Sequence, residues 1–296
     1  MELIQMKYFL AVAREESISR AADFLYITQP SLTRQIQNME KEVGQPLFVR
    51  GKKMRLTEAG QLLRRRAEEI LALYEKTERE LLHPQENVGG DVYLGGGETR
   101  AMHILLRAAQ KMRTQYPDIR LHIHSGDIAD VCEHVDKGLL DFGLVIEPAD
   151  LTKYESLRLP FTERWGLILS KRHPLAEKKE IAPEDLRGVR LIQSRHSLPK
   201  SNVTEWYKSV AQDIEIVATY NLVYNAALMA EAEIGCVLCI DGLINTTGES
   251  KVCFRPLSPP VTAHVDVIWK KYQIFSRAAQ IFLQFLREEL SATTEP

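Results

Sequence analysis

The sequence predicts a helical N-terminal region followed by an α/β domain, and three observations support this fold class. Residues 1–57 hold short amphipathic segments separated by tight turns, and residues 58–87 form one uninterrupted helical pattern. From Val88 onward, apolar β-rich runs alternate with helical patterns, which is typical of an α/β domain. A length of 296 residues is sufficient for two or three domains.

The composition indicates an ordinary globular protein whose charges are unevenly distributed. Hydrophobic residues make up 45% and charged residues 26%, and 38 Lys+Arg against 40 Asp+Glu give a net charge of −2. A charge near zero argues against a protein that coats nucleic acid by bulk electrostatics. However, residues 1–66 carry 12 Lys+Arg and 7 Asp+Glu, whereas the remainder carries 26 and 33. Any contact with nucleic acid should therefore be confined to the N-terminal end.

The sequence contains no recognisable targeting signal, and this predicts a cytoplasmic protein. The apolar stretch Tyr8–Ala13 is too short for the core of a secretion signal. No run of about 18 uncharged apolar residues is present, so we expect no membrane span. Four cysteines do not form a disulfide framework in a chain of this length.

Two groups of residues have spacings that are compatible with metal binding, but neither predicts a metal site. Cys236 and Cys239 lie in an apolar run that indicates a buried strand, on which residues three apart point to opposite faces. His122 and His124 lie two apart and share a strand face, but no third ligand is evident. We expect the cysteines to be small buried hydrophobes and the histidines to lie on a solvated face or at an interface.

Two short helices joined by a tight turn are predicted near the N-terminus. Ser17 and Thr28 are plausible N-caps of these helices. Pro30 fits the first turn of the second helix, because its missing N–H would be unpaired there. The second helix, from about Gln29 to Val43, has apolar residues at alternating spacings of four and three. These residues are Leu32, Ile36, Met39 and Val43.

The other faces of this second helix are rich in fork-shaped donors and amides. Among them are Arg34, Gln35, Gln37 and Asn38. Such side chains can bond bidentately to base edges, although a solvated face is an equally good interpretation of this helix alone. The context favours DNA, because two helices joined by a short turn form a helix-turn-helix. The following segment, Phe48–Thr57, is predicted to be a two-stranded wing with cations at its tip.

The first 60 residues resemble the signature of LysR-type transcriptional regulators over S-I-S-R-A-A-D-F-L-Y-I-T-Q-P-S-L-T-R-Q-I-Q-N-M-E-K-E-V-G-Q-P-L-F-V-R and the later L-T-E-A-G. This resemblance implies a winged helix-turn-helix in residues 1–57 that binds partly palindromic double-stranded DNA as a homodimer or homotetramer. The residues implied to contact DNA are Gln29, Pro30, Ser31, Thr33, Arg34, Arg50, Lys52 and Lys53. The wing is more basic than in many members, which favours contacts with the DNA backbone.

Residues 58–87 are predicted to form a linker helix capped by Thr57. A helix of this length spans roughly 40 Å, which is too long to be buried against one small domain. Its imperfect coiled-coil seam consists of Leu63, Ala67, Ile70, Tyr74, Thr77 and Leu81. The resemblance implies that this dimerisation helix pairs with the same helix of a second subunit.

Residues 88–296 resemble, more loosely, the effector-binding domain of the same family, which is similar to periplasmic binding proteins. The resemblance lies in the runs L-L-D-F-G-L-V, R-H-P-L-A and A-E-I-G-C-V-L. It implies two α/β lobes that hold a small molecule between them and are joined by crossings near Thr162–Arg164 and Val265–Trp269. The expected first lobe is about 88–163 with 268–296, and the expected second lobe is about 164–267.

Candidate effector-binding residues follow from the rule that ligands of open α/β sheets lie beyond the carboxyl ends of strands. The nominated residues are Glu98, Thr99, Ser125, Glu147 and Pro148 in the first lobe and Arg195, His196, Tyr224 and Asn225 in the second. Several have structural alternatives, since Thr99 and Ser125 could cap helices and Glu98 could offset a helix dipole. An acid at position 98 would repel a carboxylate ligand unless Arg100 or Arg195 compensates its charge, so polar, zwitterionic and cationic effectors all remain open.

These observations predict a sequence-specific DNA-binding regulator whose activity is modulated by a small molecule of unknown identity. The alternatives are a cytoplasmic small-molecule-binding α/β protein and an enzyme, each without a regulatory role. The helix-turn-helix counts against the first alternative. The sequence also contains no Ser/His/Asp elbow, P-loop or complete cofactor fingerprint that would support an enzyme. We therefore expect neither catalytic residues nor a cofactor.

Overall fold

The computed structural model describes all residues except 50, 52, 83–88, 196–200 and 295–296. Contacts divide the chain into two units, Met1–Leu82 and His83–Pro296, which are described separately. None of the helices in the described ranges is both long and apolar enough to cross a membrane.

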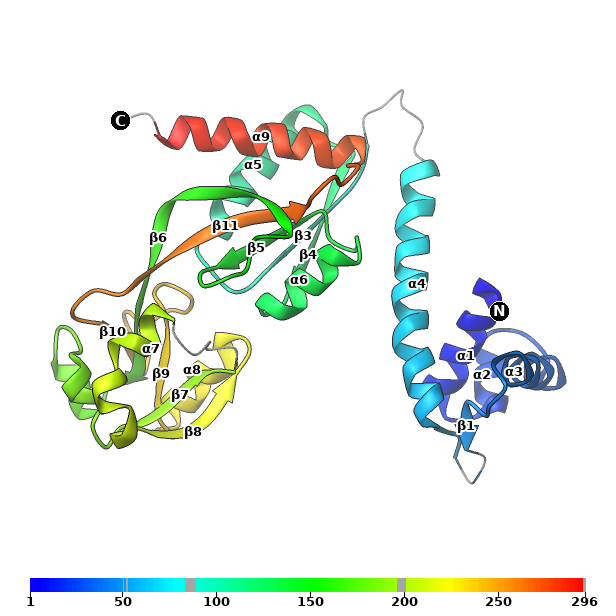
Figure 1. The fold of residues 1–296 in the computed structure, drawn as a ribbon, viewed down its shortest axis with the longest axis horizontal. Helices are drawn as coiled ribbons and strands as arrows, with labels where there is room; N and C mark the ends of the chain where they lie inside the picture. The colour runs from blue at the N-terminus through cyan, green and yellow to red at the C-terminus, as the bar shows by residue number, and fades with distance from the viewer. Residues whose placement is uncertain (50, 52, 83–88, 196–200, 295–296) are drawn as a thin grey trace. The chain divides into compact units, whose positions relative to one another are not determined.

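The N-terminal unit packs its helices around a small apolar core and adds a two-stranded wing (Figure 1). Its described elements are α1 (Leu3–Glu15), α2 (Ile18–Phe24), α3 (Gln29–Val43), β1 (Phe48–Val49), β2 (Arg55–Leu56) and α4 (Glu58–Leu82). The core joins Phe9 of α1 to Leu32 and Met39 of α3, all of which are fully buried. The predicted apolar stripe of α3 is therefore confirmed, except that Val43 is 39% exposed at the end of the helix.

The predicted helix caps differ in their side-chain bonds. The Ser17 hydroxyl accepts a hydrogen bond from the backbone N–H of Arg20, and the Thr57 hydroxyl accepts one from Gly60 at 3.0 Å. Thr28 occupies the N-cap position of α3, but its side chain makes no capping bond. Pro30 lies in the first turn of α3, as its missing N–H allows.

These differences predict unequal effects of two alanine substitutions. Ser17→Ala should lower the free energy of unfolding of the N-terminal unit by about 1 kcal/mol, because the N–H of Arg20 loses its acceptor. Thr28→Ala is the matched control and should change stability by only a few tenths of a kcal/mol, since no capping bond is lost. Thermal unfolding followed by circular dichroism measures both effects. Equal losses for the two variants would contradict this assignment.

Helix α4 is partly covered within its own unit. Ala67 and Leu71 are buried against Met6 of α1, so Ala67 faces the N-terminal unit rather than a partner helix. The predicted seam is therefore wrong at Ala67. A small residue at this spacing suits close packing against α1 as well as against a partner helix, so the spacing did not distinguish the two. Large apolar side chains elsewhere on α4 are exposed, namely Leu62, Ile70, Leu73, Tyr74 and Leu81.

The C-terminal unit is built from two groups of strands that share β6 (Figure 1). The described strands are β3 (Gly90–Gly96), β4 (Ile119–Ser125), β5 (Phe142–Ile146), β6 (Tyr154–Ser170), β7 (Arg190–Ser194), β8 (Glu215–Tyr220), β9 (Cys236–Ile240), β10 (Val252–Pro256) and β11 (Thr262–Lys270). Their order is β4-β3-β5-β11-β6 in the first lobe and β6-β9-β7-β8 in the second, where β10 also pairs with β6.

Helices cover both faces of each group of strands. The described helices are α5 (Met102–Gln115), α6 (Ile128–Asp136), α7 (Asn202–Trp206), α8 (Val223–Glu231) and α9 (Arg277–Thr294), with 3-10 turns at Pro174–Glu177, Pro183–Leu186 and Lys208–Asp213. In the first lobe, α5 and α9 share one apolar cluster and α6 lies in another. In the second lobe, α7 and α8 likewise belong to separate clusters.

Strands β6 and β11 carry the chain between the two lobes (Figure 1). Strand β6 pairs with β11 up to Arg164 and with β9 from Trp165, which agrees with the first predicted crossing. The second crossing comes earlier than Val265–Trp269, because Val265 already pairs with Ile146 of β5 in the first lobe. The predicted second boundary is wrong by several residues, since the sequence of β11 does not mark where its pairing partner changes.

The two cysteines of the C-x-x-C pair lie on opposite faces of β9. Cys236 belongs to one apolar cluster of the second lobe and Cys239 to the other, and both are buried. Burial raises the pKa of the Cys236 thiol to about 12 and also raises the pKa of Cys239. The prediction of buried hydrophobes on opposite strand faces is confirmed.

Candidate functional site

Helix α3 exposes most of the residues that were predicted to read DNA. Gln29, Pro30, Ser31 and Arg34 are exposed, while Leu32 on the opposite side is fully buried. Thr33 is half-buried, and its hydroxyl donates a hydrogen bond to the carbonyl oxygen of Gln29 at 2.9 Å. The N-terminal half of α3 is thus held by the core and presents a polar surface.

The wing is a short antiparallel hairpin in which Phe48 pairs with Leu56 and Val49 pairs with Arg55. Its basic residue Lys53 is largely exposed and donates a hydrogen bond to the Glu16 carboxylate at 2.7 Å. This bond with Lys53 is the main cause that lowers the pKa of Glu16. Part of the positive charge of the wing is therefore balanced by Glu16.

Arg50 and Lys52, which the resemblance also places on the wing, lie outside the described residues.

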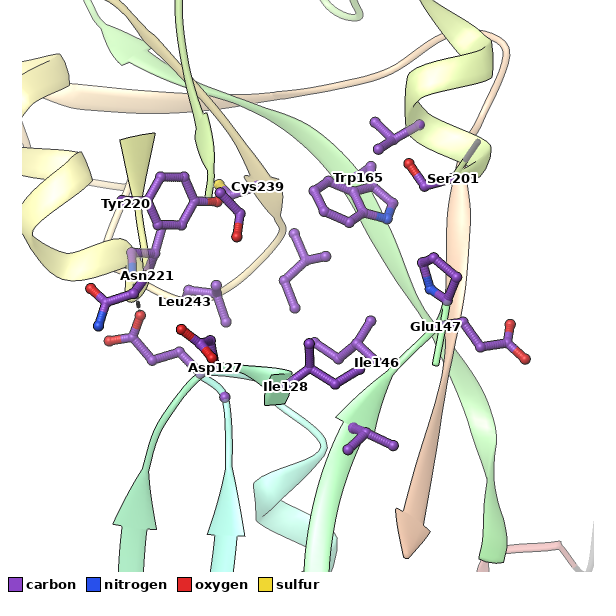
Figure 2. A pocket seen from close by; sticks show the side chains of 18 of the residues that line it. Asp127, Ile128, Ile146, Glu147, Trp165, Ser201, Tyr220, Asn221, Cys239 and Leu243 are labelled. Atoms are coloured by element: carbon purple, nitrogen blue, oxygen red, sulfur yellow. Dashed lines mark hydrogen bonds between the residues drawn. The ribbon is translucent and has the colours of Figure 1, made fainter. Parts of the chain in front are cut away.

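A cavity of about 160 Å³ lies between the two lobes of the C-terminal unit (Figure 2). Its wall is mainly apolar, with Ile128 and Ile146 from the first lobe and Trp165 and Leu243 from the second. The other lining residues are Gly97, Glu98, Asp127, Leu144, Val145, Glu147, Pro148, Ser194, Ser201, Val203, Tyr220, Asn221, Val223, Cys239 and Ile240.

Two hydrogen-bonded contacts connect the lobes beside this cavity. The Glu98 carboxylate accepts a hydrogen bond from the backbone N–H of Val223 at the first turn of α8. The Asp127 carboxylate, which is 7% exposed, accepts one from Arg195 at 2.8 Å. Negative charge at the start of a helix is favourable, so Glu98 suits its position at α8.

The third acid of the cavity, Glu147, is neutralised within the first lobe. Its carboxylate pairs with Arg158, which also binds the buried Asp266 at 3.0 Å. Figure 2 shows the Glu147 carboxylate pointing away from the centre of the cavity. Each acid that lines the cavity therefore has a partner, and the described lining residues include three acids and no Lys, Arg or His.

The nominated effector-binding residues take different positions. Glu98, Glu147 and Pro148 line the cavity. Thr99 and Ser125 are not among the described lining residues: the Thr99 hydroxyl donates to Glu163 at 2.5 Å, and Ser125 is exposed at the end of β4.

The nominees of the second lobe lie near the cavity rather than in its described wall. Arg195 reaches it only through its ion pair with Asp127. Tyr224 and Asn225 are exposed on α8, and Tyr224 is 64% exposed. His196 lies outside the described residues.

Sequence reasoning missed the apolar wall of the cavity. It selected polar residues at strand ends, whereas Ile128, Ile146, Trp165 and Leu243 look like core residues in the sequence. Tyr220 was also missed; its hydroxyl donates to the carbonyl oxygen of Leu238 at 2.8 Å, and burial raises the pKa of this phenol. A signal for Asp127 was present, because an acid after Ser125-Gly126 is a typical helix N-cap.

Two family models match the chain. The model described as the LysR substrate binding domain matches residues 85–291, and the model described as a bacterial regulatory helix-turn-helix protein of the lysR family matches residues 3–61. The chain belongs to the LysR family of transcriptional regulators. The expected winged helix-turn-helix and two-lobed α/β domain agree with these two matches, and the helix-turn-helix model describes a regulatory protein.

Curated relatives carry the names of transcriptional regulators. The Hca operon transcriptional activator HcaR of Escherichia coli is 30% identical over 301 residues, which cover 99% of this LysR-family chain and 100% of HcaR. A probable RuBisCO transcriptional regulator of Synechocystis sp. is 36% identical over 194 residues, which cover 64% of this chain and 56% of that protein. The latter match therefore spans little more than half of the relative.

Solved structures share the fold of this LysR-family chain. Full-length CbnR complexed with its target DNA has a TM-score of 0.77 at 22% identity, with 98% of this chain and 100% of CbnR covered. Full-length BenM has a TM-score of 0.54 at 23% identity, with 100% of this chain and 99% of BenM covered.

Proposed function

We propose that this LysR-family chain is a sequence-specific DNA-binding transcriptional regulator that reads its operator with α3 and the wing. The observation that carries this proposal is the exposed polar face of α3, where Gln29, Ser31 and Arg34 surround the N-terminal turns. A recognition helix enters the major groove by this end. The exposed Lys53 suits contact with phosphates. Because operator DNA is the partner, we propose that the protein acts in the cytoplasm.

The operator-bound form is proposed to be a homodimer or a homotetramer on a partly palindromic site. Support comes from α4, where Leu62, Ile70 and Leu81 are exposed although they are large and apolar. A second copy of the helix would remove this surface from water. Two-fold symmetry of a dimer would then match the symmetry of the site.

The effector is proposed to bind in the cavity between the lobes and to be small, mostly apolar, and uncharged or cationic. An apolar cavity of about 150 Å³ can hold benzene, so a volume of about 160 Å³ suits a molecule built on a single ring. Asp127 and Glu147 are paired with arginines, whereas the Glu98 carboxylate accepts its hydrogen bond from a backbone N–H, and none of the described lining residues is basic. This balance of charge disfavours a carboxylate. A ligand that binds one arrangement of the lobes more tightly would shift the population toward it. The contacts Glu98–Val223 and Asp127–Arg195 are the interlobe contacts that such a shift would alter.

A thermal-shift experiment tests the effector class with three ring compounds that differ in charge, namely phenol, benzylamine and benzoate. We expect phenol or benzylamine to raise the Tm of the C-terminal unit, because a ligand that binds only the native state stabilises it. Benzoate should have no effect at the same concentration. A shift with benzoate alone would contradict the proposed class.

Filling the cavity should remove this response. Leu243→Trp places a larger side chain in the wall, so we expect it to abolish the shift caused by the active compound. The variant should leave operator binding without ligand unchanged, since the substitution is in the C-terminal unit. The matched control is Ile274→Trp, at a residue that is 96% exposed in the same unit, and it should keep the full response. An unchanged response in Leu243→Trp would place the ligand elsewhere.

A further inference from the structure

Three side chains with metal-binding chemistry meet at the end of strand β4 and on the neighbouring helix α6. His124 comes from β4, whereas Asp130 and His134 come from α6. One nitrogen or oxygen atom from each lies within 4.8 Å of the others. The Asp130 carboxylate bonds to Nε2 of His124 and lies 3.5 Å from Nδ1 of His134. The two imidazole rings are 4.3 Å apart between centroids.

The local backbone explains why these groups converge. Asp130 and His134 are four residues apart on α6, so they share one face of the helix. Gly126 lies beside them in the turn between β4 and α6, where a Cβ atom would be 1.9 Å from Oδ2 of Asp130. A side chain at position 126 would therefore displace the carboxylate.

The neighbouring histidine has a different environment. His122 shares a face of β4 with His124, but its Nε2 lies 2.9 Å from the Asp91 carboxylate and its ring stacks on Tyr93 at 4.7 Å. His122 therefore interacts with Asp91 and Tyr93, whereas His124 interacts with Asp130 on α6.

We propose that His124, Asp130 and His134 bind a divalent transition-metal ion of the zinc class. Imidazole nitrogen and carboxylate oxygen are ligands that zinc takes at about 2.0–2.2 Å, which places tetrahedral ligand atoms roughly 3.5 Å apart. One ligand atom from each side chain already lies within 4.8 Å of the others, so adjustments of the side chains alone bring them to this spacing. Three protein ligands leave a fourth position for water or another small ligand.

Accessibility and local hydrogen bonding fit this assignment. The side chains are 38%, 37% and 29% exposed for His124, Asp130 and His134, so an ion can reach them from solvent. Nδ1 of His134 lies 2.8 Å from the backbone carbonyl oxygen of Asp130. A bond of this kind fixes the orientation of a ligating imidazole and leaves its other nitrogen for the ion.

A bound ion at this position would connect two elements of the first lobe. Its ligands come from β4 and α6, so a bound ion would cross-link the strand to the helix. Helix α6 is capped by Asp127, which accepts a hydrogen bond from the N–H of Asp130 at 3.2 Å and also pairs with Arg195 of the second lobe. The ion would therefore hold the turn of α6 that carries this interlobe contact.

Zinc titration of the untagged full-length protein, previously treated with a chelator, tests the site. We expect calorimetry to show one ion bound per chain, and the ion should raise the Tm until chelator is added again. His124→Gln and His134→Gln should each weaken the Kd for zinc at least about tenfold, because each removes one ligand. His103→Gln, at an exposed histidine on α5, is the matched control and should bind as the unaltered protein does.

Folding of the variants is checked independently of zinc. Each glutamine variant should have the same Tm as the unaltered protein in the presence of chelator, and Asp130→Asn provides a third variant if one of the others fails this check. Absence of zinc binding by the unaltered protein, or an equal Kd in the folded variants, would overturn the proposal and leave a hydrogen-bonded His–Asp–His cluster. The result does not depend on which effector the cavity binds.

Discussion

Replacing Phe142 with alanine should lower the free energy of unfolding of the C-terminal unit by about 3–5 kcal/mol. Phe142 is fully buried on β5, and its ring lies 5.0 Å from Phe275, 5.3 Å from Phe282 and 6.0 Å from Trp269 between centroids. These partners belong to β11, α9 and the segment between them, so the ring joins separate parts of the first lobe. Truncation would leave a cavity that this closely packed core cannot fill completely.

Urea unfolding followed by tryptophan fluorescence measures this loss, because Trp269 lies beside the substituted ring. Ile274→Ala is the control within the same unit, and it should have little effect since Ile274 is 96% exposed. Operator binding by the folded fraction should be retained, because Phe142 lies outside Met1–Leu82. A loss in Phe142→Ala no larger than that of Ile274→Ala would show that the aromatic cluster contributes little to stability.

Replacing Arg34 with alanine should weaken operator binding by about 1–3 kcal/mol, or roughly 5- to 150-fold, and should relax sequence preference. Arg34 is exposed on α3, and its guanidinium can bond bidentately to a guanine base edge. The variant should fold normally, because its neighbour Leu32 rather than Arg34 contributes to the core. Fluorescence anisotropy with operator and with scrambled DNA measures both effects.

The variant Lys53→Ala distinguishes a contact with phosphates from contacts with base edges. It should weaken binding to operator and scrambled DNA by similar factors and should reduce the salt dependence, as expected for a phosphate contact. Its ion pair with Glu16 is exposed, so losing that pair should change stability little.

If Arg34→Ala left operator binding unchanged, Arg34 would not belong to the residues that read the sequence.

The N-terminal helices could be predicted in detail because their signals are local. A serine before a helix, a proline in a first turn and apolar residues at spacings of three and four each act within a few residues. Ser17 and Leu32 behave as these rules predict. Two departures concern packing between elements: Ala67 on α4 is buried by α1, and Val43 at the end of α3 is left exposed. Their spacing alone could not indicate which surface would cover them.

The candidate effector site could be predicted only in part because its wall is apolar. The rule for strand ends selected Glu98 and Glu147, which line the cavity, but it also selected Tyr224, which is exposed. Ile146 and Leu243 come from different lobes and meet only because β6 and β11 bring the lobes together. Thr99 points to a different partner, Glu163, which lies 64 residues later on β6.

The sequence by itself determined the order of the two units, the helix-turn-helix, the α/β character of the remainder and the separation of basic from acidic regions. These properties follow from short-range patterns and from composition. Only the tertiary structure decided the wall of the cavity, the contacts Glu98–Val223 and Asp127–Arg195, and the meeting of His124 with Asp130 and His134. Each depends on how strands and helices pack against one another, and periodicity along the chain does not carry that information.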